Sequence, residues 1–281
     1  MRFTKMQGCG NDYVYINCFV ETVKSPEQLA KAVSDRHFGI GSDGLVLICP
    51  SSVADCCMHM YNPDGSESEM CGNAIRCVAK YVYDRNIVHK SSVTVETLAG
   101  IKIIAVTTDD KDIARTLTVD MGEPIVEAAQ VPVVADVSPV KDLKLSAYGR
   151  EFTATCVSMG NPHAVIFIDE DVTDFDVEKY GKVFEVDEHF PRKANIEFVN
   201  VISPEHLKMR VWERGTGETL ACGTGTCATV AAACLNGISP RKPVTVDLLG
   251  GQLTIEWKES DGHIYMTGPA EFTFDGEYYY G

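Results

Sequence analysis

Two segments of the chain match each other: MCGNAIRC at residues 70–77 and ACGTGTC at residues 221–227. In each segment a cysteine, Cys71 or Cys222, precedes a turn of glycine and polar residues that opens an apolar stretch. This pattern is typical of a cysteine at the N-terminus of a helix. Unpaired backbone N–H groups and the helix dipole there stabilise a thiolate and lower its pKa from about 8.5. We therefore expect both thiols to be prepared for proton transfer.

Further anchors recur around the two cysteines in the same order. Asn11 lies 60 positions before Cys71, and Asn161 lies 61 positions before Cys222. The other anchors are His-Phe at 37–38 and 189–190, and polar residues nine positions before each cysteine, Asn62 and Glu213. A repeat of this length is of domain size rather than a short solenoid repeat. The sequence thus predicts two similar domains, with one thiol removing a proton and the other delivering one.

The pattern of apolar residues favours many short strands and few helices. β-rich runs separated by Gly, Pro, Asn and Asp turns occur along the whole chain. Helices are expected at 26–35, 73–85, 175–183 and 224–236. The last of these is almost uncharged and must be buried nearly all round. We predict an α+β fold of two pseudo-symmetric domains, each a curved mixed or antiparallel sheet wrapped around a central helix.

The domain boundary is expected near Arg115. This gives an N-terminal domain of residues 1–115 and a C-terminal domain of residues 116–267. The strands expected around 266–280 would return to the first domain, so that 268–281 completes it. Residues 124–144, which are polar and contain prolines, are interpreted as a connector just inside the second half.

Composition excludes several classes of function. The chain has 281 residues and a net charge of −15, which argues against binding to nucleic acid or anionic membranes. It has no run of 18 apolar residues and no secretory signal at its start, so a cytoplasmic location is expected. Eleven cysteines, an odd number, are then expected to be reduced.

The turns at the two cysteines are candidate anion sites. The backbone N–H groups of Gly72, Asn73, Gly223 and Thr224 could hold one carboxylate between two helix dipoles. Such a site stabilises the charge that develops when the α-proton of an amino acid leaves, so no Schiff-base cofactor is required. The polar residues offered for the amine and carboxylate groups of a substrate are Asn11, Asn62, Asn161, Asn195, Glu213 and Arg214.

Other roles of the two thiols have less support in the sequence. Zinc is disfavoured because Cys71 and Cys77, like Cys222 and Cys227, do not form C-x-x-C pairs. A phosphate-binding loop lacks its Gly-Lys-Ser/Thr, and a Cys-His acyl-transfer pair with His163 leaves the second thiol unexplained. Redox sensing by the two thiols remains the non-catalytic alternative.

At these residues the chain resembles the diaminopimelate epimerase family over its whole length. The resemblance rests on the segments 10–12, 62–66, 69–73, 160–163, 195–199, 213–215 and 221–225. It implies interconversion of LL- and meso-diaminopimelate in lysine and peptidoglycan precursor synthesis, without pyridoxal phosphate, metal or other cofactor. It also implies a small amino-acid substrate and a possible homodimer.

The resemblance further implies roles for single residues. Cys222 would be the base and Cys71 the acid in the LL to meso direction, with the roles exchanged in reverse. His163 and Glu213 would tune the thiols. The reacting carboxylate would bind Gly72, Asn73, Gly223 and Thr224, and the distant amino-acid centre would bind Asn62, Asn161, Asn195 and Arg214.

One departure from the family pattern stands at Gly44, where some members carry glutamine. A substrate contact is therefore expected to be missing there or supplied by water. The rival enzyme is a racemase of another amino acid, such as histidine, on the same framework. Racemases of proline or hydroxyproline have Cys-Gly-His at the first thiol, whereas this chain has Asn73 in place of the histidine.

Overall fold

The computed structural model describes residues 1–279, which divide into two compact units. Unit 1 comprises Met1–Asp120 and the chain from Thr267 onward, and unit 2 comprises Met121–Met266. Both units are built from many strands and two helices each. The α+β fold predicted from the sequence is confirmed.

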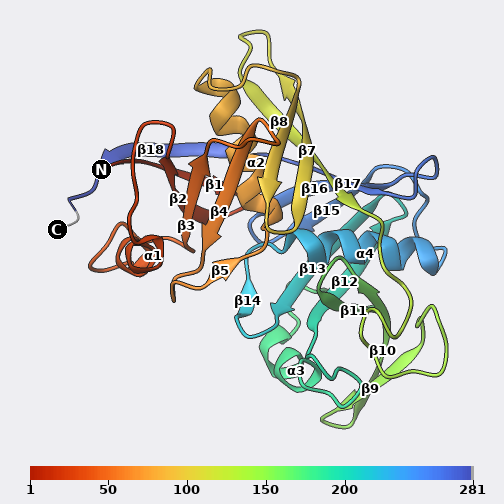
Figure 1. Cartoon of the computed structure of the whole chain (residues 1–281). Coiled ribbons are helices and arrows are strands. Elements are labelled where there is room, and N and C mark those ends of the chain that lie inside the picture. Colours follow the sequence, from red (N-terminus) through yellow and green to blue (C-terminus); the bar gives the residue numbers. More distant parts are fainter. Residues whose placement is uncertain (280–281) are drawn as a thin grey trace. The chain divides into compact units, whose positions relative to one another are not determined.

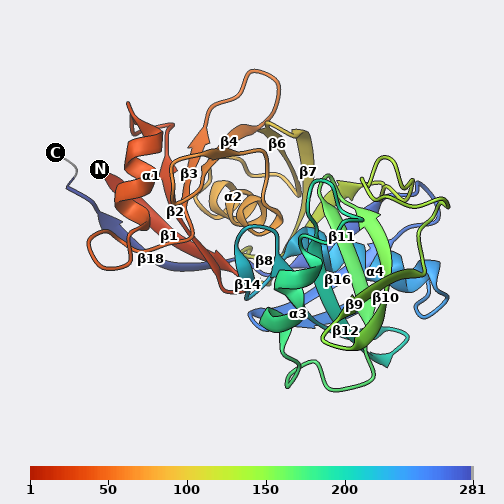
Figure 2. The same ribbon diagram turned by 90° about the horizontal axis from the view of Figure 1, so that it is seen from below.

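Unit 1 is a mixed sheet that curves around one helix. Strand β18 pairs with β1 and β1 with β2 in antiparallel fashion, β2 with β3 in parallel, β3 with β4 antiparallel and β4 with β6 parallel. Figure 2 shows the central helix α2 end-on, surrounded by strands of this sheet. Its elements are β1 (Arg2–Gly8), β2 (Asn11–Asn17), α1 (Pro26–Ser34), β3 (Leu45–Cys49), β4 (Cys56–Tyr61), β5 (Glu67–Ser68), α2 (Gly72–Asp84), β6 (Ser92–Thr97), β7 (Gly100–Thr108), β8 (Ala114–Gly122) and β18 (Glu271–Glu277).

Unit 2 repeats this order of strand pairings. Strand β10 pairs with β11 antiparallel, β11 with β12 parallel, β12 with β13 antiparallel and β13 with β15 parallel, and α4 takes the place of α2 (Figure 1). Its elements are β9 (Leu143–Ala147), β10 (Arg150–Ser158), β11 (Pro162–Phe167), α3 (Val177–Phe184), β12 (Asn195–Ser203), β13 (His206–Glu213), β14 (Gly217–Thr219), α4 (Gly223–Leu235), β15 (Val244–Leu248), β16 (Gly251–Trp257) and β17 (Ile264–Gly268).

The two central helices are buried because their sequences leave almost no polar face. In α4 only Thr224, Cys234 and Leu235 are not buried, as its lack of charge predicts. In α2 even the polar Asn73, Arg76 and Lys80 are buried. Buried polar groups are stable only when they are hydrogen-bonded, so these three side chains must have partners inside the unit.

Some elements differ from those that the sequence indicates. Both central helices begin one residue earlier than expected, at the glycine that follows the cysteine. Residues 124–144 are not merely a polar connector, because Val131, Val133 and Val140 are buried in the core of unit 2. Of the last strands, expected around 266–280, β17 begins earlier, at Ile264, and β18 ends at Glu277; Tyr280 lies outside the described residues. Within residues 1–279, no helix is long and apolar enough to cross a membrane.

Candidate active site

Cys71 is the N-cap residue of α2. Its backbone is extended, with φ −132° and ψ 125°, and its carbonyl accepts the first intrahelical bond, from Ile75 N at 3.0 Å. The N–H groups of Gly72 and Asn73 precede this bond and therefore have no acceptor within the helix. The predicted position of the thiol at a helix N-terminus is thus observed in unit 1.

Asn11, at the start of β2, contacts this helix terminus. Its Oδ1 accepts from the Cys71 thiol at 3.5 Å and from Nδ2 of Asn73 at 3.4 Å. On its other side, Nδ2 of Asn11 donates to Oδ2 of Asp43 at 2.8 Å. Three residues predicted from the sequence, Asn11, Cys71 and Asn73, are therefore brought together.

Asn62 lies in the turn between β4 and β5 of the same unit. Its side-chain amide donates to Oγ of Ser66 at 3.0 Å, and its backbone N–H donates to Ser66 O at 2.8 Å. These bonds close the turn that leads into β5 and on to Cys71. Among residues 1–279, these hydrogen bonds of Asn62 are made to Ser66 of the same turn.

Cys222 is the N-cap residue of α4, the counterpart of Cys71. Its sulfur accepts from the backbone N–H of Gly225 at 3.4 Å and lies 3.5 Å from the hydroxyl of Thr224. The carbonyl of Cys222 accepts from Thr226 N at 2.9 Å, so the thiol stands at a helix N-terminus as predicted. The N–H groups of Gly223 and Thr224 have no acceptor within the helix.

The expectation of a lowered thiol pKa is wrong for Cys222. Burial of the sulfur raises its pKa well above the ordinary value, and the nearby carboxylates of Glu213 and Glu197 raise it further. The bonds from Thr224 and from Gly225 N act in the opposite direction but are the smaller effects. Desolvation and two negative charges therefore outweigh the helix terminus.

Glu213 ends strand β13 beside Cys222. Its Oε1 accepts from the hydroxyl of Thr219, which lies in the neighbouring strand β14. Burial raises the pKa of this carboxyl, while Thr219, His163 and Cys222 lower it. The carboxyl of Glu213 and the thiol of Cys222 therefore influence each other's pKa.

His163 is fully buried and reaches Cys222 only through other residues. Its Nδ1 lies 2.6 Å from Oε1 of Glu197, and its Nε2 lies 3.0 Å from Oδ1 of Asn161. Nδ2 of Asn161 in turn donates to the Thr224 hydroxyl at 3.4 Å. With both ring nitrogens engaged in this way, a Cys-His acyl-transfer pair has no support in the geometry.

Asn195 and Arg214 complete the predicted set in unit 2. Asn195 pairs with His163 across β11 and β12, donates to Pro162 O at 2.9 Å and accepts from Arg214 N at 2.9 Å. The guanidinium of Arg214 is exposed and donates to Arg192 O at 2.9 Å. Asn195 therefore holds the loop from which Arg214 projects.

Two carboxylates that contact predicted site residues are not among those that the sequence indicates. Asp43 follows the Gly-rich turn after His37 and has no counterpart in the paired segment. Glu197 lies within an apolar strand and is 0 % exposed. A charged residue inside an apolar run is rarely buried without a partner, so Glu197 could have been noticed on that ground.

Gly225 is required by the position of Glu197. A Cβ atom at residue 225 would lie 2.6 Å from Oε1 of Glu197 and 3.2 Å from the Cys222 sulfur. Only glycine allows the buried carboxylate and the first turn of α4 to approach this closely.

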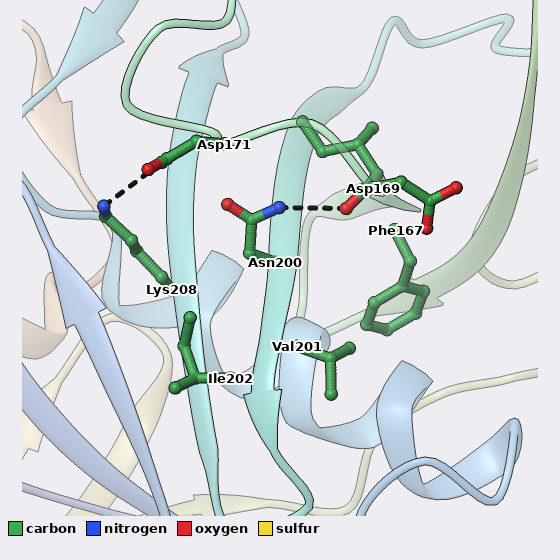
Figure 3. A pocket seen from close by; sticks show the side chains of 8 residues that line it. Phe167, Asp169, Asp171, Asn200, Val201, Ile202 and Lys208 are labelled. Carbon is green, nitrogen blue, oxygen red and sulfur yellow. Dashed lines mark hydrogen bonds and ion pairs between the residues drawn. The ribbon is translucent and has the colours of Figure 1, made fainter.

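A surface pocket of unit 2 lies apart from these residues (Figure 3). The pocket is lined by residues at the C-terminal ends of β11 and β12, among them Phe167, Asn200 and Ile202. His163 and Asn195 lie at the N-terminal ends of the same two strands. The side-chain amide of Asn200 in this pocket already has partners within the protein, because it donates to Ile168 O at 2.9 Å and to Glu170 O at 2.8 Å. Within residues 1–279, no group of three or more His, Cys, Asp or Glu is placed to hold a metal ion.

A family model described as diaminopimelate epimerase matches residues 3–127 and 155–273. The chain belongs to the diaminopimelate epimerase family. The matched residues include both cysteines and their flanking turns, and the family predicted from the sequence is confirmed. Members of this family are isomerases.

Curated relatives that match over nearly their full length are diaminopimelate epimerases. The diaminopimelate epimerase of Methanococcus maripaludis is 57% identical over 277 residues, covering 99% of each chain. That of Acetivibrio thermocellus is 58% identical over 277 residues, covering 99% of this chain and 98% of the relative.

Solved structures of distant proteins share the fold. A PhzF-family phenazine biosynthesis protein from Bacillus anthracis matches with a TM-score of 0.73 at 17% identity, covering 100% of this chain and 99% of that one. A probable proline racemase from Agrobacterium radiobacter matches with a TM-score of 0.72 at 13% identity, covering 99% and 92%. At such identities the likeness concerns the fold alone.

The departure of this diaminopimelate epimerase family member at Gly44 has a structural reason. A Cβ atom at residue 44 would lie 2.3 Å from Tyr61 O and 2.8 Å from Cε1 of Tyr13, and the backbone has φ +153°. A glutamine does not fit unless both tyrosines move. The space beside residue 44 is filled by the buried ring of Tyr13 rather than left for water.

Proposed function

We propose that the chain catalyses the cofactor-independent epimerisation of LL-diaminopimelate to meso-diaminopimelate, in lysine and peptidoglycan precursor synthesis. The observation that carries the proposal is the matched pair of N-cap thiols, Cys71 on α2 and Cys222 on α4. Each thiol stands at the start of the central helix of its unit, in a chain 57% identical to a curated epimerase over its full length.

The proposed chemistry needs only the two sulfurs. In the LL to meso direction, the thiolate of Cys222 takes the α-proton, and the electron pair of the C–H bond passes onto the α-carbon and its carboxylate. The thiol of Cys71 then gives its proton to the opposite face of that carbon. The reaction leaves Cys222 as thiol and Cys71 as thiolate, which is the arrangement needed for the reverse direction.

The helix termini are proposed to hold the reacting carboxylate. The N–H groups of Gly72 and Asn73 in unit 1, and of Gly223 and Thr224 in unit 2, have no acceptor within their helices. Donors of this kind favour an anion and stabilise the extra charge of the carbanion more than that of the substrate.

The distant amino-acid centre is proposed to bind polar side chains around the same turns. The exposed guanidinium of Arg214 can form a bidentate pair with a carboxylate. Glu213 is proposed to tune Cys222 and to meet an ammonium group, and His163 to act on the thiol through Asn161. The remaining contacts are assigned to Asn11, Asn62, Asn161 and Asn195.

The organisation around this reaction is proposed as well. The two enzyme domains are residues 1–115, completed by 268–281, and residues 116–267. The protein is proposed to work in the cytoplasm as a homodimer.

Proton NMR in D₂O tests the proposed reaction directly. Reduced protein is offered LL-diaminopimelate beside histidine, proline and lysine. Deuterium entering only the α-position of diaminopimelate, with meso product appearing, supports the proposal. Exchange into histidine instead keeps the chemistry and replaces the substrate, whereas exchange into none of the four favours redox sensing.

Removal of either thiol tests the assignment of acid and base. We expect Cys71→Ala and Cys222→Ala each to lower epimerisation by at least about 10²-fold, because a positioned proton donor or acceptor is lost. Any residual α-exchange in Cys71→Ala should be confined to the LL isomer, since only the Cys222 face remains. Cys234→Ala, at the far end of α4, is the control and should retain activity. Full activity in either active-site variant would exclude the two-thiol mechanism.

A further inference from the structure

The side-chain amide of Asn11 is held between two groups of opposite character. On one side stands Asp43, whose Oδ2 is 2.8 Å from Nδ2 of Asn11 and also accepts from Asp12 N at 3.0 Å. An ionised carboxylate can only accept hydrogen bonds. The nitrogen of the Asn11 amide must therefore face Asp43, and its oxygen must face the other way.

A second fixed point lies on the helix. Arg76 is 0 % exposed and donates from Nη2 to Oδ1 of Asn73 at 2.8 Å. A guanidinium can only donate, so the nitrogen of the Asn73 amide must point away from it. That nitrogen is 3.4 Å from Oδ1 of Asn11.

Arg76 at one end and Asp43 at the other therefore fix the direction of the three hydrogen bonds between them. Arg76 donates to Asn73, Asn73 donates to Asn11 and Asn11 donates to Asp43. Neither amide can rotate by itself without placing donor against donor or acceptor against acceptor. The carbonyl oxygen of Asn11 is in consequence held 3.5 Å from the Cys71 sulfur, where only a protonated thiol can donate to it.

Asp43 also contacts a cation. Nη2 of Arg36 lies 2.9 Å from Oδ1 of Asp43 and 2.9 Å from Oδ1 of Asp12, so one guanidinium bridges the two carboxylates. Asp12 is also paired with Lys5 at 2.6 Å. Two cations thus stand against two carboxylates at the outer end of the amide chain.

The sulfur of Cys222 has the opposite hydrogen-bond character. The backbone N–H of Gly225 can only donate, so at 3.4 Å the Cys222 sulfur is its acceptor. An N–H donor favours a thiolate, whereas the carbonyl of Asn11 favours a thiol. The two helix termini match in backbone and differ in the groups beside their sulfurs. Cys222 faces the N–H of Gly225, whereas Cys71 faces the carbonyl of Asn11 and the hydroxyl of Tyr13, whose pKa is raised by burial and by the neighbouring Cys71.

We propose that Asp43 is a positioning residue, which fixes the amide of Asn11 so that its carbonyl oxygen holds the proton on Cys71 between turnovers. The inference rests on the proposed function, because it assigns the resting proton to the thiol that acts as acid in the LL to meso direction. Asp43 contacts Asn11 and acts through it.

Alkylation of Cys71 tests this without substrate. The rate of reaction with iodoacetamide is measured against pH, by mass spectrometry of the peptide containing Cys71, in the whole protein and in Asp43→Ala and Asp43→Asn. In Asp43→Ala the Asn11 amide loses the acceptor of its NH₂ group, and only the 3.4 Å contact with Nδ2 of Asn73 still opposes a turn of that NH₂ toward the sulfur. We expect the midpoint to move to lower pH by about one unit.

The asparagine variant separates orientation from charge. Its carbonyl can still accept from Asn11 and Asp12 N, so the amide stays in place although the negative charge is lost. We expect its midpoint to move less than half as far as that of Asp43→Ala. Equal shifts in the two variants, or no shift in a folded Asp43→Ala, would overturn the proposal. Asp109→Ala is the matched control, because Asp109 also accepts backbone N–H groups and pairs with an arginine.

A measurement on the unmodified protein covers the case in which Asp43→Ala does not fold. In nitrogen-15 spectra, one side-chain NH₂ proton of Asn11 should lie downfield of its partner, because it is hydrogen-bonded to Oδ2 of Asp43. Two Asn11 NH₂ protons with ordinary shifts would contradict the proposal. Both measurements are made without diaminopimelate, so they stand even if the protein turns over another amino acid.

Discussion

Cys222 shows how a helix terminus and burial compete at a single sulfur. A thiol at an N-cap is usually a stronger acid because backbone N–H groups face it. Here the sulfur is buried beside Glu213 and Glu197, and its pKa is raised. Loss of the negative charge on Glu213, or a substrate cation bound near it, would lower the pKa of Cys222 and favour the thiolate. The pKa of Cys222 is thus raised first by burial and then by its two carboxylate neighbours.

Replacing Glu213 by glutamine should lower the pKa of Cys222. The sign follows from electrostatics, because a nearby negative charge destabilises a thiolate and its removal stabilises one. Alkylation of Cys222 by iodoacetamide, followed against pH, should therefore reach its midpoint at lower pH. A midpoint that rises or stays fixed would show that Glu213 does not set the charge at this sulfur.

The control for this variant is Glu218→Gln. Glu218 lies in the adjacent strand β14 and is paired with Arg210 at 2.6 Å. It is not among the groups that shift the pKa of Cys222. Its variant should leave the alkylation profile of Cys222 in place.

The positions of the two thiols at helix starts could be predicted from the sequence because the signals for them are local. A cysteine before a glycine turn marks a helix start, and matched spacings mark its counterpart. The sign of the Cys222 pKa shift could not be predicted, because it depends on Glu197 from another strand. The contact of Asp43 with Asn11 could not be predicted for the same reason, since it forms only when β2 and β3 have paired.

At the scale of elements, the turn before β3 shows a requirement that is steric rather than chemical. Gly44 stands where a side chain would meet the backbone of β4 at Tyr61 and the ring of Tyr13 in β2. In this chain Tyr61 O and the ring of Tyr13 fill the space that a side chain at residue 44 would enter. The glutamine that some family members carry does not fit the packing found here.

Gly44→Ala should lower the free energy of unfolding by about 1–3 kcal/mol through overpacking, in addition to the strain of its backbone conformation. Urea unfolding measures the loss. Gly100→Ala is the matched control, because Gly100 also has a left-handed φ of +88° but a Cβ there would meet nothing within 4 Å. The difference between the two variants isolates the steric part. Equal losses would mean that Tyr13 and Tyr61 yield without cost.

At the scale of the whole molecule, the two units differ in how the chain builds them. Unit 2 is one continuous segment, whereas unit 1 needs β18 from the far end of the chain. Strand β18 pairs with β1 from Arg2↔Glu277 to Gln7↔Glu271, and Asp275 accepts from Thr4 at 2.6 Å. The repeat was evident in the sequence, but the partner of β1 was less so, because long-range strand pairing leaves no local pattern.

We therefore expect the fragments 121–266 and 1–120 to behave differently. The first should fold alone, while the second should be largely unfolded, because β1 loses its neighbour along one whole edge. Circular dichroism and amide NMR of the isolated fragments measure this. Residues 1–120 joined by a flexible linker to 267–281 serve as the control and should recover structure. A well-folded 1–120 fragment would show that β18 is dispensable.

The pairing of β1 with β18 also places the amino group of Met1 against Tyr278 O, 3.1 Å apart. A short peptide link between these neighbours would close the backbone into a ring without disturbing either unit. Cutting that ring before residue 267 gives a circular permutant in which unit 1 is translated as one uninterrupted piece and unit 2 as another. The order in which the ribosome delivers the two units is thus separable from the architecture that they reach.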